Sequence, residues 1–275
     1  MDWNNIIFAI LCLGALGAIF GFCLAYASKI FYVEIDERVE GIVGVLPGAN
    51  CGGCGFAGCS AYATAIVETG APITSCAPGG GTVSAQIAAI MGVEAQSVVR
   101  TVAAVKCSGG VNASKKFDYL GINDCVAANR IDNGQLACPN GCLGFGTCVN
   151  VCAFGALSIV DGVAVVNHEL CTGCMKCSTV CPKQLFQPVP YSAEVRVACA
   201  TQERGPAVRK FCTVGCIGCT ICQKTCQFDA VHVENNLSAI DYTKCTNCGE
   251  CAAKCPRKII KDANPDRQMP AGTVA

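Results

Sequence analysis

The chain has 275 residues, with 20 Lys or Arg and 20 Asp or Glu, so its formal net charge is zero. This balance lacks the basic excess of nucleic-acid-binding proteins, and we expect no nucleic-acid partner. The chain also has 26 cysteines, which restricts the interpretation to disulfides, zinc or iron–sulfur clusters. Cys12 and Cys23 lie in an apolar N-terminal run, whereas the other 24 cysteines, six sets of four, lie beyond residue 50.

The apolar run predicts a membrane anchor over residues 1–28. From Ile6 to Ala27 no residue is charged, and the run is long enough to cross a bilayer as a helix. A cleaved signal peptide is the alternative, because Ala25-Tyr26-Ala27 resembles a cleavage site. The preceding residues carry no positive charge, however, and the apolar run exceeds the usual length of a signal peptide. We therefore expect a retained anchor, in which Cys12 and Cys23 are plain apolar residues.

The basic residues near the anchor predict its orientation. Lys29 and Arg38 follow the apolar run and no basic residue precedes it. The positive-inside rule then places the N-terminus outside the plasma membrane and the remaining domain in the cytoplasm. A reducing cytoplasm argues against a disulfide framework.

Turn residues divide the rest of the chain. Glycine and proline clusters predict a linker over 29–46, a first [4Fe–4S] domain over 47–82 and a connecting region over 83–137. Within the connecting region, Val83 to Val105 has a helical pattern with a break near Gly92. The tail, residues 262–275, is expected to be disordered.

An internal repeat organises residues 138–261. Leu157 to Pro182 aligns without gaps on Val231 to Pro256, at an offset of 74 residues. Each copy contains β-branched residues on both sides of a turn, Asp161-Gly162 or Asn235-Asn236, which predicts a hairpin. We expect a first module over 138–185, a connection over 186–211 and a second module over 212–261.

The second half of each repeat carries the cysteine spacing C-x2-C-x2-C-x3-C-P of bacterial ferredoxins. Three cysteines on a tight loop present their thiolates to one cluster, and the fourth points toward a neighbouring cluster. This exchange predicts four ligand sets: Cys216, Cys219, Cys222 with Cys255; Cys245, Cys248, Cys251 with Cys226; Cys171, Cys174, Cys177 with Cys152; and Cys138, Cys142, Cys148 with Cys181.

A separate group, Cys51, Cys54, Cys59 and Cys76, begins in a glycine-rich loop whose backbone can approach a cluster closely. Zinc, as in a structural cysteine-rich protein, is the alternative, but zinc sites usually show two distant C-x2-C pairs or mixed Cys and His ligands. The two histidines, His168 and His232, lie outside the cysteine runs.

Four cysteines then remain: Cys107, Cys125, Cys199 and Cys212. Four is the number that one further [4Fe–4S] cluster needs, so the count predicts about six clusters. No local spacing supports this set. Cys212 aligns on Cys138 at the 74-residue offset, so these two cysteines could exchange roles.

Taken together, the sequence predicts an α+β protein with a single N-terminal transmembrane helix, a small Cys-rich [4Fe–4S] domain and tandem ferredoxin-like modules. It resembles the B subunit of the Rnf complex, a membrane-bound ferredoxin:NAD⁺ oxidoreductase coupled to ion transport. The resemblance rests on the anchor, the loop LPGANCGGCGFAGC with Cys76 downstream, and the order of the ferredoxin-type runs.

The resemblance implies that the chain accepts electrons from reduced ferredoxin and passes them to membrane and flavin-bearing subunits, with no catalytic site of its own. No G-x-G-x-x-G motif follows a strand, so NAD⁺ is expected to bind a partner. An iron–sulfur subunit of another membrane dehydrogenase or hydrogenase is the alternative. The basic residues Lys254, Arg257, Lys258 and Lys261 form either an ordinary solvated surface or a docking face for an acidic ferredoxin, and the resemblance makes them the candidate docking face.

Overall fold

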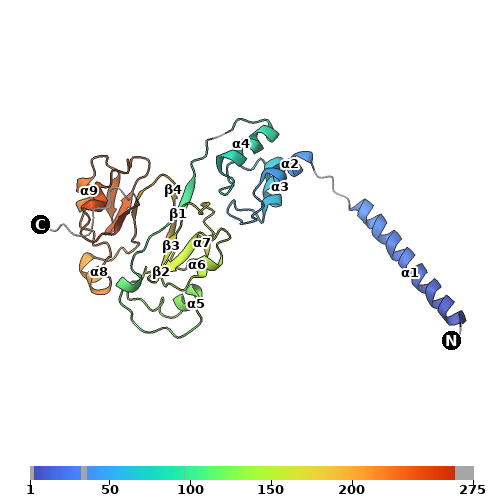
Figure 1. Cartoon of the computed structure of the whole chain (residues 1–275), viewed down its shortest axis with the longest axis horizontal. Helices are drawn as coiled ribbons and strands as arrows, with labels where there is room; N and C mark the ends of the chain where they lie inside the picture. Colours follow the sequence, from blue (N-terminus) through green and yellow to red (C-terminus); the bar gives the residue numbers. More distant parts are fainter. Residues whose placement is uncertain (1–2, 32–35, 96, 264–275) are drawn as a thin grey trace.

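The computed structural model describes residues 3–31, 36–95 and 97–263. Three parts follow one another along its longest axis: a lone helix, a small helical domain and a larger part that holds the repeats (Figure 1). The predicted tail lies outside the described residues from 264 onward, as do residues 32–35 of the predicted linker.

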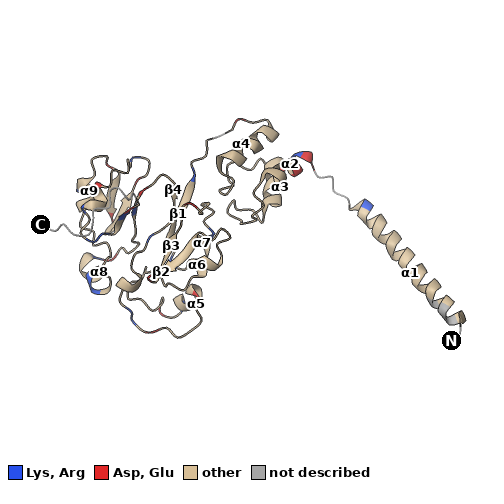
Figure 2. Cartoon of the chain, viewed as in Figure 1, with Lys and Arg blue, Asp and Glu red and all other residues tan. Residues whose placement is uncertain are grey.

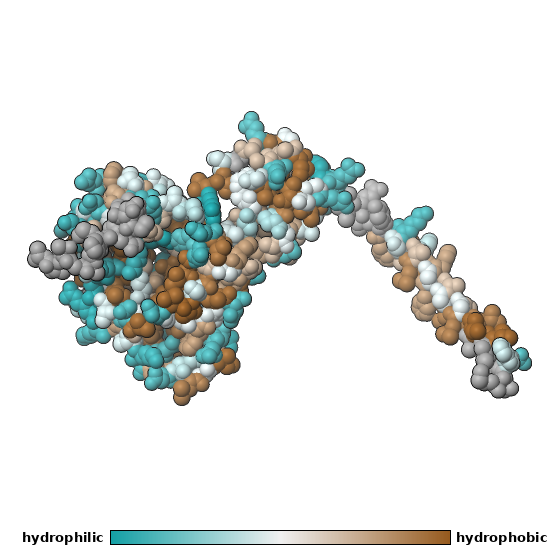
Figure 3. Space-filling model, in the orientation of Figure 1, coloured by the Kyte–Doolittle hydropathy of each residue, from teal (hydrophilic) through white to brown (hydrophobic). Residues whose placement is uncertain are grey.

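The lone helix is α1, Trp3–Ile30. Of the helices described, it alone is long and apolar enough to cross a membrane, and none of its apolar window, Ile10–Ile30, is buried against the rest of the chain. Apolar side chains cover its surface (Figure 3), and its one basic residue, Lys29, lies in the last turn (Figure 2). These are the properties that a bilayer-spanning segment needs.

The small domain packs three helices: α2 (Glu37–Val45), α3 (Cys59–Thr69) and α4 (Gly80–Met91). Helix α2 lies in the segment predicted as a linker, yet Ile42 is fully buried against the α3 and α4 side chains. The Asp36 carboxylate caps this helix by accepting a 2.9 Å hydrogen bond from the Arg38 backbone N–H. The helical domain therefore spans residues 36–92.

Gly92 ends α4 in the left-handed conformation, with φ of +66°, as the predicted break requires. Beyond it, the predicted continuation of a helix to Val105 is wrong, because β1 (Thr101–Val105) is a strand. A short apolar run of this kind does not distinguish helix from strand by itself. Antiparallel pairing of β1 with β4 (Phe186–Pro190), a strand far along the chain, decides the conformation.

The first repeat module, residues 101–190, is closed by this β1–β4 pair around a central hairpin. The predicted boundaries, 138–185, leave both closing strands outside. Its other elements are η1 (Gly110–Asn112), α5 (Cys125–Asn129), α6 (Thr147–Asn150), β2 (Leu157–Val160), β3 (Val163–Val166) and α7 (Lys176–Val180).

The second repeat module, residues 193–262, repeats this plan. Strand β5 (Val195–Val197) pairs antiparallel with β8 (Ile260–Asp262), so the segment predicted as a connection supplies a closing strand. Its other elements are α8 (Gly205–Phe211), α9 (Ile221–Thr225), β6 (Val231–Glu234), β7 (Leu237–Ile240) and α10 (Glu250–Ala253).

Both predicted hairpins are confirmed. Strand β2 pairs with β3, and β6 pairs with β7, each through a two-residue turn. The turn residues have positive φ: +49° and +74° for Asp161-Gly162, and +48° and +64° for Asn235-Asn236. Two successive positive φ values match the twist of the flanking strands, which explains why Asp, Asn and Gly occupy the turns.

The two modules meet through backbone contacts. Ala113 forms an isolated antiparallel bridge with Cys212. Next to it, the Ser114 N–H donates to the Phe211 carbonyl at 2.8 Å, and the Thr213 N–H donates to the Asn112 carbonyl at 3.0 Å. This junction brings together two segments that are about a hundred residues apart in sequence.

Replacing Ile42 by Ala tests whether α2 belongs to the helical domain. Because Ile42 is fully buried, Ile42→Ala should destabilise the domain by about 2–5 kcal/mol, through lost burial and the cavity left behind. Thermal unfolding of the full chain measures this effect. Val43→Ala is the matched control, since Val43 is 36% exposed on the same helix; equal, small shifts for both variants would show that α2 is only a linker.

Candidate metal centres

The described cysteines beyond the anchor form six groups, which we name sites A to F. In four of them, four cysteines line one cavity, with the following members: site C, Cys125, Cys142, Cys148 and Cys181; site D, Cys107, Cys138, Cys199 and Cys212; site E, Cys216, Cys219, Cys222 and Cys255; site F, Cys226, Cys245, Cys248 and Cys251. These cavities are similar in size, at about 10–20 Å³ each.

Sites A and B follow from neighbouring thiols. Site A comprises Cys51, Cys54, Cys59 and Cys76, and the first three are electrostatic neighbours of Cys76. Site B comprises Cys177, its electrostatic neighbours Cys171 and Cys174, and Cys152, which packs against the same core as Cys171 and Cys177. Cys152 corresponds to Cys226 of site F at the 74-residue offset.

The glycine-rich loop of site A is held by Asn50. Its side-chain Oδ1 accepts a 2.8 Å hydrogen bond from the Cys59 N–H at the start of α3. A β-carbon at Gly58 would lie 2.9 Å from this oxygen, closer than side chains tolerate. Glycine therefore allows the loop to fold back so that Cys51, Cys54 and Cys59 face Cys76.

Sites E and F group the cysteines of the second module as the spacing predicts. Cys255, at the end of the second run, lines the cavity of the first run, and Cys226 lines the cavity of the second. The fourth cysteine of each run is thus exchanged between the two sites. Cys219 and Cys248 are exposed, so both sites approach the surface of this module.

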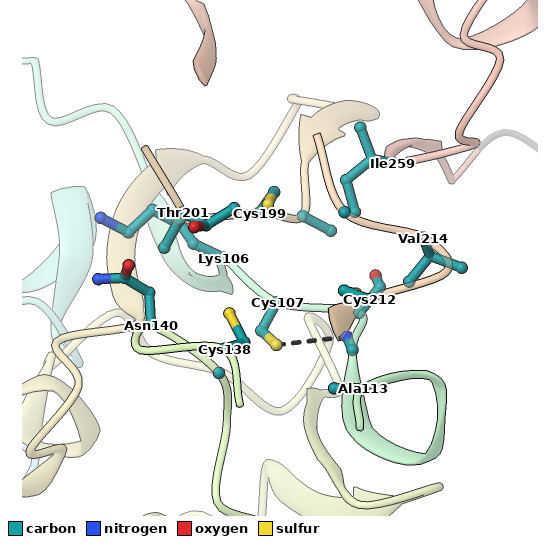
Figure 4. Close-up of a pocket in the computed structure, with 16 residues that line it drawn as sticks. Lys106, Cys107, Ala113, Cys138, Asn140, Cys199, Thr201, Cys212, Val214 and Ile259 are labelled. Atoms are coloured by element: carbon teal, nitrogen blue, oxygen red, sulfur yellow. Dashed lines mark hydrogen bonds between the residues drawn. The ribbon is translucent and has the colours of Figure 1, made fainter. Parts of the chain in front are cut away.

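Sites C and D differ from the predicted sets: Cys125 and Cys138 exchange places. Cys138 lines the cavity of site D together with Cys107, Cys199 and Cys212 (Figure 4). Cys125 lies beside Cys142 in site C, in the position predicted for Cys138. The correction has a signal in the sequence, because Cys138 aligns on Cys212 and both stand before the ferredoxin-type run of their repeat.

Thr147 explains how Cys125 reaches site C. The Cys125 N–H donates a 2.8 Å hydrogen bond to the Thr147 hydroxyl, which in turn donates to the Asp124 carboxylate at 2.8 Å. These two bonds join the start of α5 to the start of α6, next to Cys148. The equivalent ligand in the second module is Cys219, which belongs to the ferredoxin-type run. Phe145 stands at the corresponding position of the first module, so Cys125 supplies the missing sulfur from outside the run.

Site D takes two equivalent cysteines from each module. Cys107 follows β1, and Cys199 follows β5, at the same place in the two folds. The Cys142 N–H donates to Cys107 Sγ at 3.4 Å, and the equivalent Cys216 N–H donates to Cys199 Sγ at 3.4 Å. With Cys138 and Cys212 as the second matched pair, site D lies where the two modules meet.

Two basic side chains at equivalent positions, Lys183 and Arg257, hold the loops that carry Cys138 and Cys212. Lys183 Nζ donates to the carbonyls of Asn133 and Pro139, at 2.7 and 2.8 Å. Seventy-four residues later, Arg257 donates to the carbonyls of Cys212, at 2.6 Å, and Gly215, at 3.2 Å. Arg257 therefore points into the module and is not a free member of the predicted docking face.

The donor set of these sites fits iron–sulfur clusters. Each site offers four sulfurs, and backbone N–H groups point at several of them, including Ala103 to Cys171 at 3.4 Å and Ala230 to Cys226 at 3.4 Å. N–H···S hydrogen bonds of this kind stabilise a charged cluster and adjust its potential.

Burial disfavours bare thiolates in the same sites. It is the main reason that the pKa values of Cys142, Cys177 and Cys251 are raised to about 12, with neighbouring cysteines adding to the effect. A bound metal must therefore displace these protons, and binding weakens as pH falls.

The sites form a continuous series of neighbours. A β-carbon at Gly53 of site A would lie 2.8 Å from the Cys174 carbonyl of site B, so these two loops touch. Cys177 of site B and Cys148 of site C are electrostatic neighbours, as are Cys251 of site F and Cys222 of site E. The hydrogen bond from the Cys142 N–H to Cys107 Sγ joins site C to site D, and the one from the Cys216 N–H to Cys199 Sγ joins site E to site D.

Three family models match the chain. A model described as "Putative Fe-S cluster" matches residues 46–78, which hold site A. A 4Fe-4S binding domain matches residues 163–186, and a 4Fe-4S dicluster domain matches residues 215–260. All four cysteines of site D lie outside the matched segments.

Curated relatives match most of the chain. The B subunit of the ion-translocating oxidoreductase complex of Methanosarcina acetivorans is 43% identical, over 90% of this chain and 95% of the relative. The B subunit of the Na(+)-translocating ferredoxin:NAD(+) oxidoreductase complex of Acetobacterium woodii is 46% identical, over 94% and 78%. The proton-translocating counterpart of Clostridium ljungdahlii is 45% identical, over 94% and 93%. The chain therefore belongs to the family of B subunits of ion-translocating oxidoreductase complexes.

Proposed function

We propose that the chain is the electron-transfer subunit of a membrane-bound, ion-translocating ferredoxin:NAD⁺ oxidoreductase. It accepts electrons from reduced ferredoxin and relays them to membrane and flavin-bearing partner subunits. One observation carries the proposal: six four-cysteine sites adjoin one another, from the repeat modules to the domain that follows α1. NAD⁺ reduction and ion transport belong to the partners, and the chain supplies the conducting path.

Each site holds one [4Fe–4S] cluster in this proposal, with the ligands grouped as sites A to F. A [4Fe–4S] cluster accepts and releases one electron at a time without large rearrangement of its ligands. The chain's own residues fix the spacing between sites, exclude water and donate hydrogen bonds to the cysteine sulfurs. The Gly53–Cys174 contact then delivers electrons to site A, the site that lies nearest to the anchor in sequence.

Iron analysis of paired cysteine variants tests the ligand sets. Six clusters predict about 24 iron atoms per chain in the anaerobically purified protein. Cys107→Ala combined with Cys138→Ala disrupts site D alone and should remove about four iron atoms, whereas Cys107→Ala with Cys125→Ala disrupts sites C and D and should remove about eight. The ligand sets predicted from the sequence give the opposite result: the first pair of substitutions would remove about eight iron atoms and the second about four. Stoichiometric zinc in place of iron would overturn the electron-transfer function itself.

A side chain at Gly53 tests the relay toward site A. Gly53→Val keeps every cysteine but forces the loops of sites A and B apart, because its β-carbon meets the Cys174 backbone. Ferredoxin should still reduce the repeat modules of the purified complex, while ferredoxin-dependent NAD⁺ reduction falls at least about tenfold, since one extra barrier of about 1.4 kcal/mol has that effect.

The matched control is Gly81→Val, where a β-carbon meets no atom within 4 Å. Unchanged NAD⁺ reduction with Gly53→Val at full iron content would mean that electrons do not pass from site B to site A. A wild-type complex that ferredoxin reduces, but that never reduces NAD⁺, would contradict the wider function.

The proposed orientation places the N-terminus outside the cell and the repeat modules in the cytoplasm. It rests on Lys29 and Arg38, which follow α1 on the side of the domain. Protease added to inside-out membrane vesicles should digest the modules, whereas protease added to intact spheroplasts should leave them whole. Digestion in spheroplasts alone would reverse the orientation.

A further inference from the structure

A cleft of about 480 Å³ separates the β2–β3 hairpin of the first module from strands β5 and β8 of the second. Its wall in the first module combines the valines of the hairpin with the polar residues Ser108, Asn112, Asp161 and His168. Val160 and Val165 are the exposed valines, at 51% and 45%. Apolar surface is visible over this hairpin region in Figure 3. A contiguous exposed apolar surface with polar residues at its rim is typical of an interaction site.

The opposite wall of the cleft is cationic. Arg196 of β5 and Lys261 of β8 both line it, and they lie directly across from each other in the register of the two strands. Like charges in this arrangement repel each other and destabilise the strand pair. Among the ion pairs of the described residues, none includes either cation, so the repulsion is not offset by a carboxylate in a direct ion pair.

The Arg196 guanidinium is half-buried and contacts the His168 imidazole of the first module. Burial, together with the charge of Arg196, lowers the pKa of His168 to about 4, so the imidazole is neutral near pH 7 and does not add charge. Asp161, in the hairpin turn, is the one carboxylate among the described residues that line the cleft. The cleft therefore keeps a net positive charge of about one.

The floor of the cleft leads directly to a metal site. Cys107 lines this cleft and also the cavity of site D. A group seated in the cleft is thus separated from site D by the side chain of one cysteine. From site D, the neighbouring site C leads on through site B to site A.

We propose that this cleft seats an acidic segment of the reduced electron-carrier protein. A carboxylate of the carrier lies between Arg196 and Lys261, and an apolar neighbour packs on Val160 and Val165. One electron leaves the reduced carrier and enters site D through Cys107; no bond is made or broken and no proton moves. The inference rests on the proposed function and adds the place where electrons are taken up.

The four basic residues of the predicted docking face do not all line the cleft. Arg257 donates to backbone carbonyls within the module, and Lys261 faces the cleft beside Arg196, a residue far from it in sequence. Lys254 and Lys258 are exposed and do not line the cleft. A docking site at the cleft and one at the predicted basic face therefore respond to different substitutions.

The test uses the purified complex with the full chain and follows, by stopped-flow absorbance, its reduction by a reduced acidic ferredoxin. Lys261→Glu should slow reduction about tenfold at low salt and have little effect at high salt, as electrostatic steering requires. Val165→Trp fills the cleft without changing charge and should slow reduction at every salt concentration. Lys210→Glu, an exposed residue of α8 outside the cleft, changes the charge equally and should have little effect.

Reduction by dithionite, which needs no protein docking, reports whether the clusters of each variant are intact. Normal rates with Lys261→Glu and Val165→Trp would overturn the cleft, and so would equal slowing by Lys258→Glu, which would favour the predicted basic face. Self-association of the full chain that Val165→Trp abolishes would place a second copy in the cleft and also overturn the proposal. Failure of ferredoxin to reduce the wild-type complex, when dithionite does reduce it, would instead contradict the proposed function.

Discussion

Burial of four thiols in one site is the constraint on which the rest of this molecule depends. Burial raises the pKa of Cys142, Cys177 and Cys251 to about 12, so their thiolates are stable in these sites only when a cationic metal centre offsets the charge. The second module depends strongly on these thiols, because its buried core includes Cys199, Cys216, Cys222 and Cys251. Metal binding and folding are therefore expected to be one process in the modules, whose sheets have only two strands each.

Duplication explains the plan of the modules, and site D shows what duplication adds. Each copy uses a strand, a hairpin and a closing strand to hold two sites. Each copy also has a cysteine two residues after β1 or β5 that neither of its own sites uses. Alone, one copy offers only two ligands for a further site. Paired across the junction at Ala113 and Cys212, the two copies offer four. The junction thus joins the modules by backbone pairing and by a shared centre at once.

The helical domain has a different construction that suits its place after the anchor. Its core of Ile42, Ile66 and Ile87 is an ordinary apolar one, and site A lies at its edge, where the Gly53 loop touches Cys174. Stability of this domain does not depend on cysteines alone. It can therefore hold site A between α1, which is long and apolar enough to cross a membrane, and the cysteine-rich modules.

Features that depend on local spacing can be predicted from the sequence. The charge-free run of α1, the turns at Asp161-Gly162 and Asn235-Asn236, and the grouping in sites E and F all follow from residues close together in the chain. Three features become visible only in the folded chain: α2 as part of a core, β1 as a strand, and the exchange of Cys125 and Cys138 between sites C and D. Each of these depends on a partner distant in sequence, such as β4 for β1 and Thr147 for Cys125, and local spacing contains no information about such a partner. Only the 74-residue repeat, which equates Cys138 with Cys212, carries part of that long-range arrangement in the sequence.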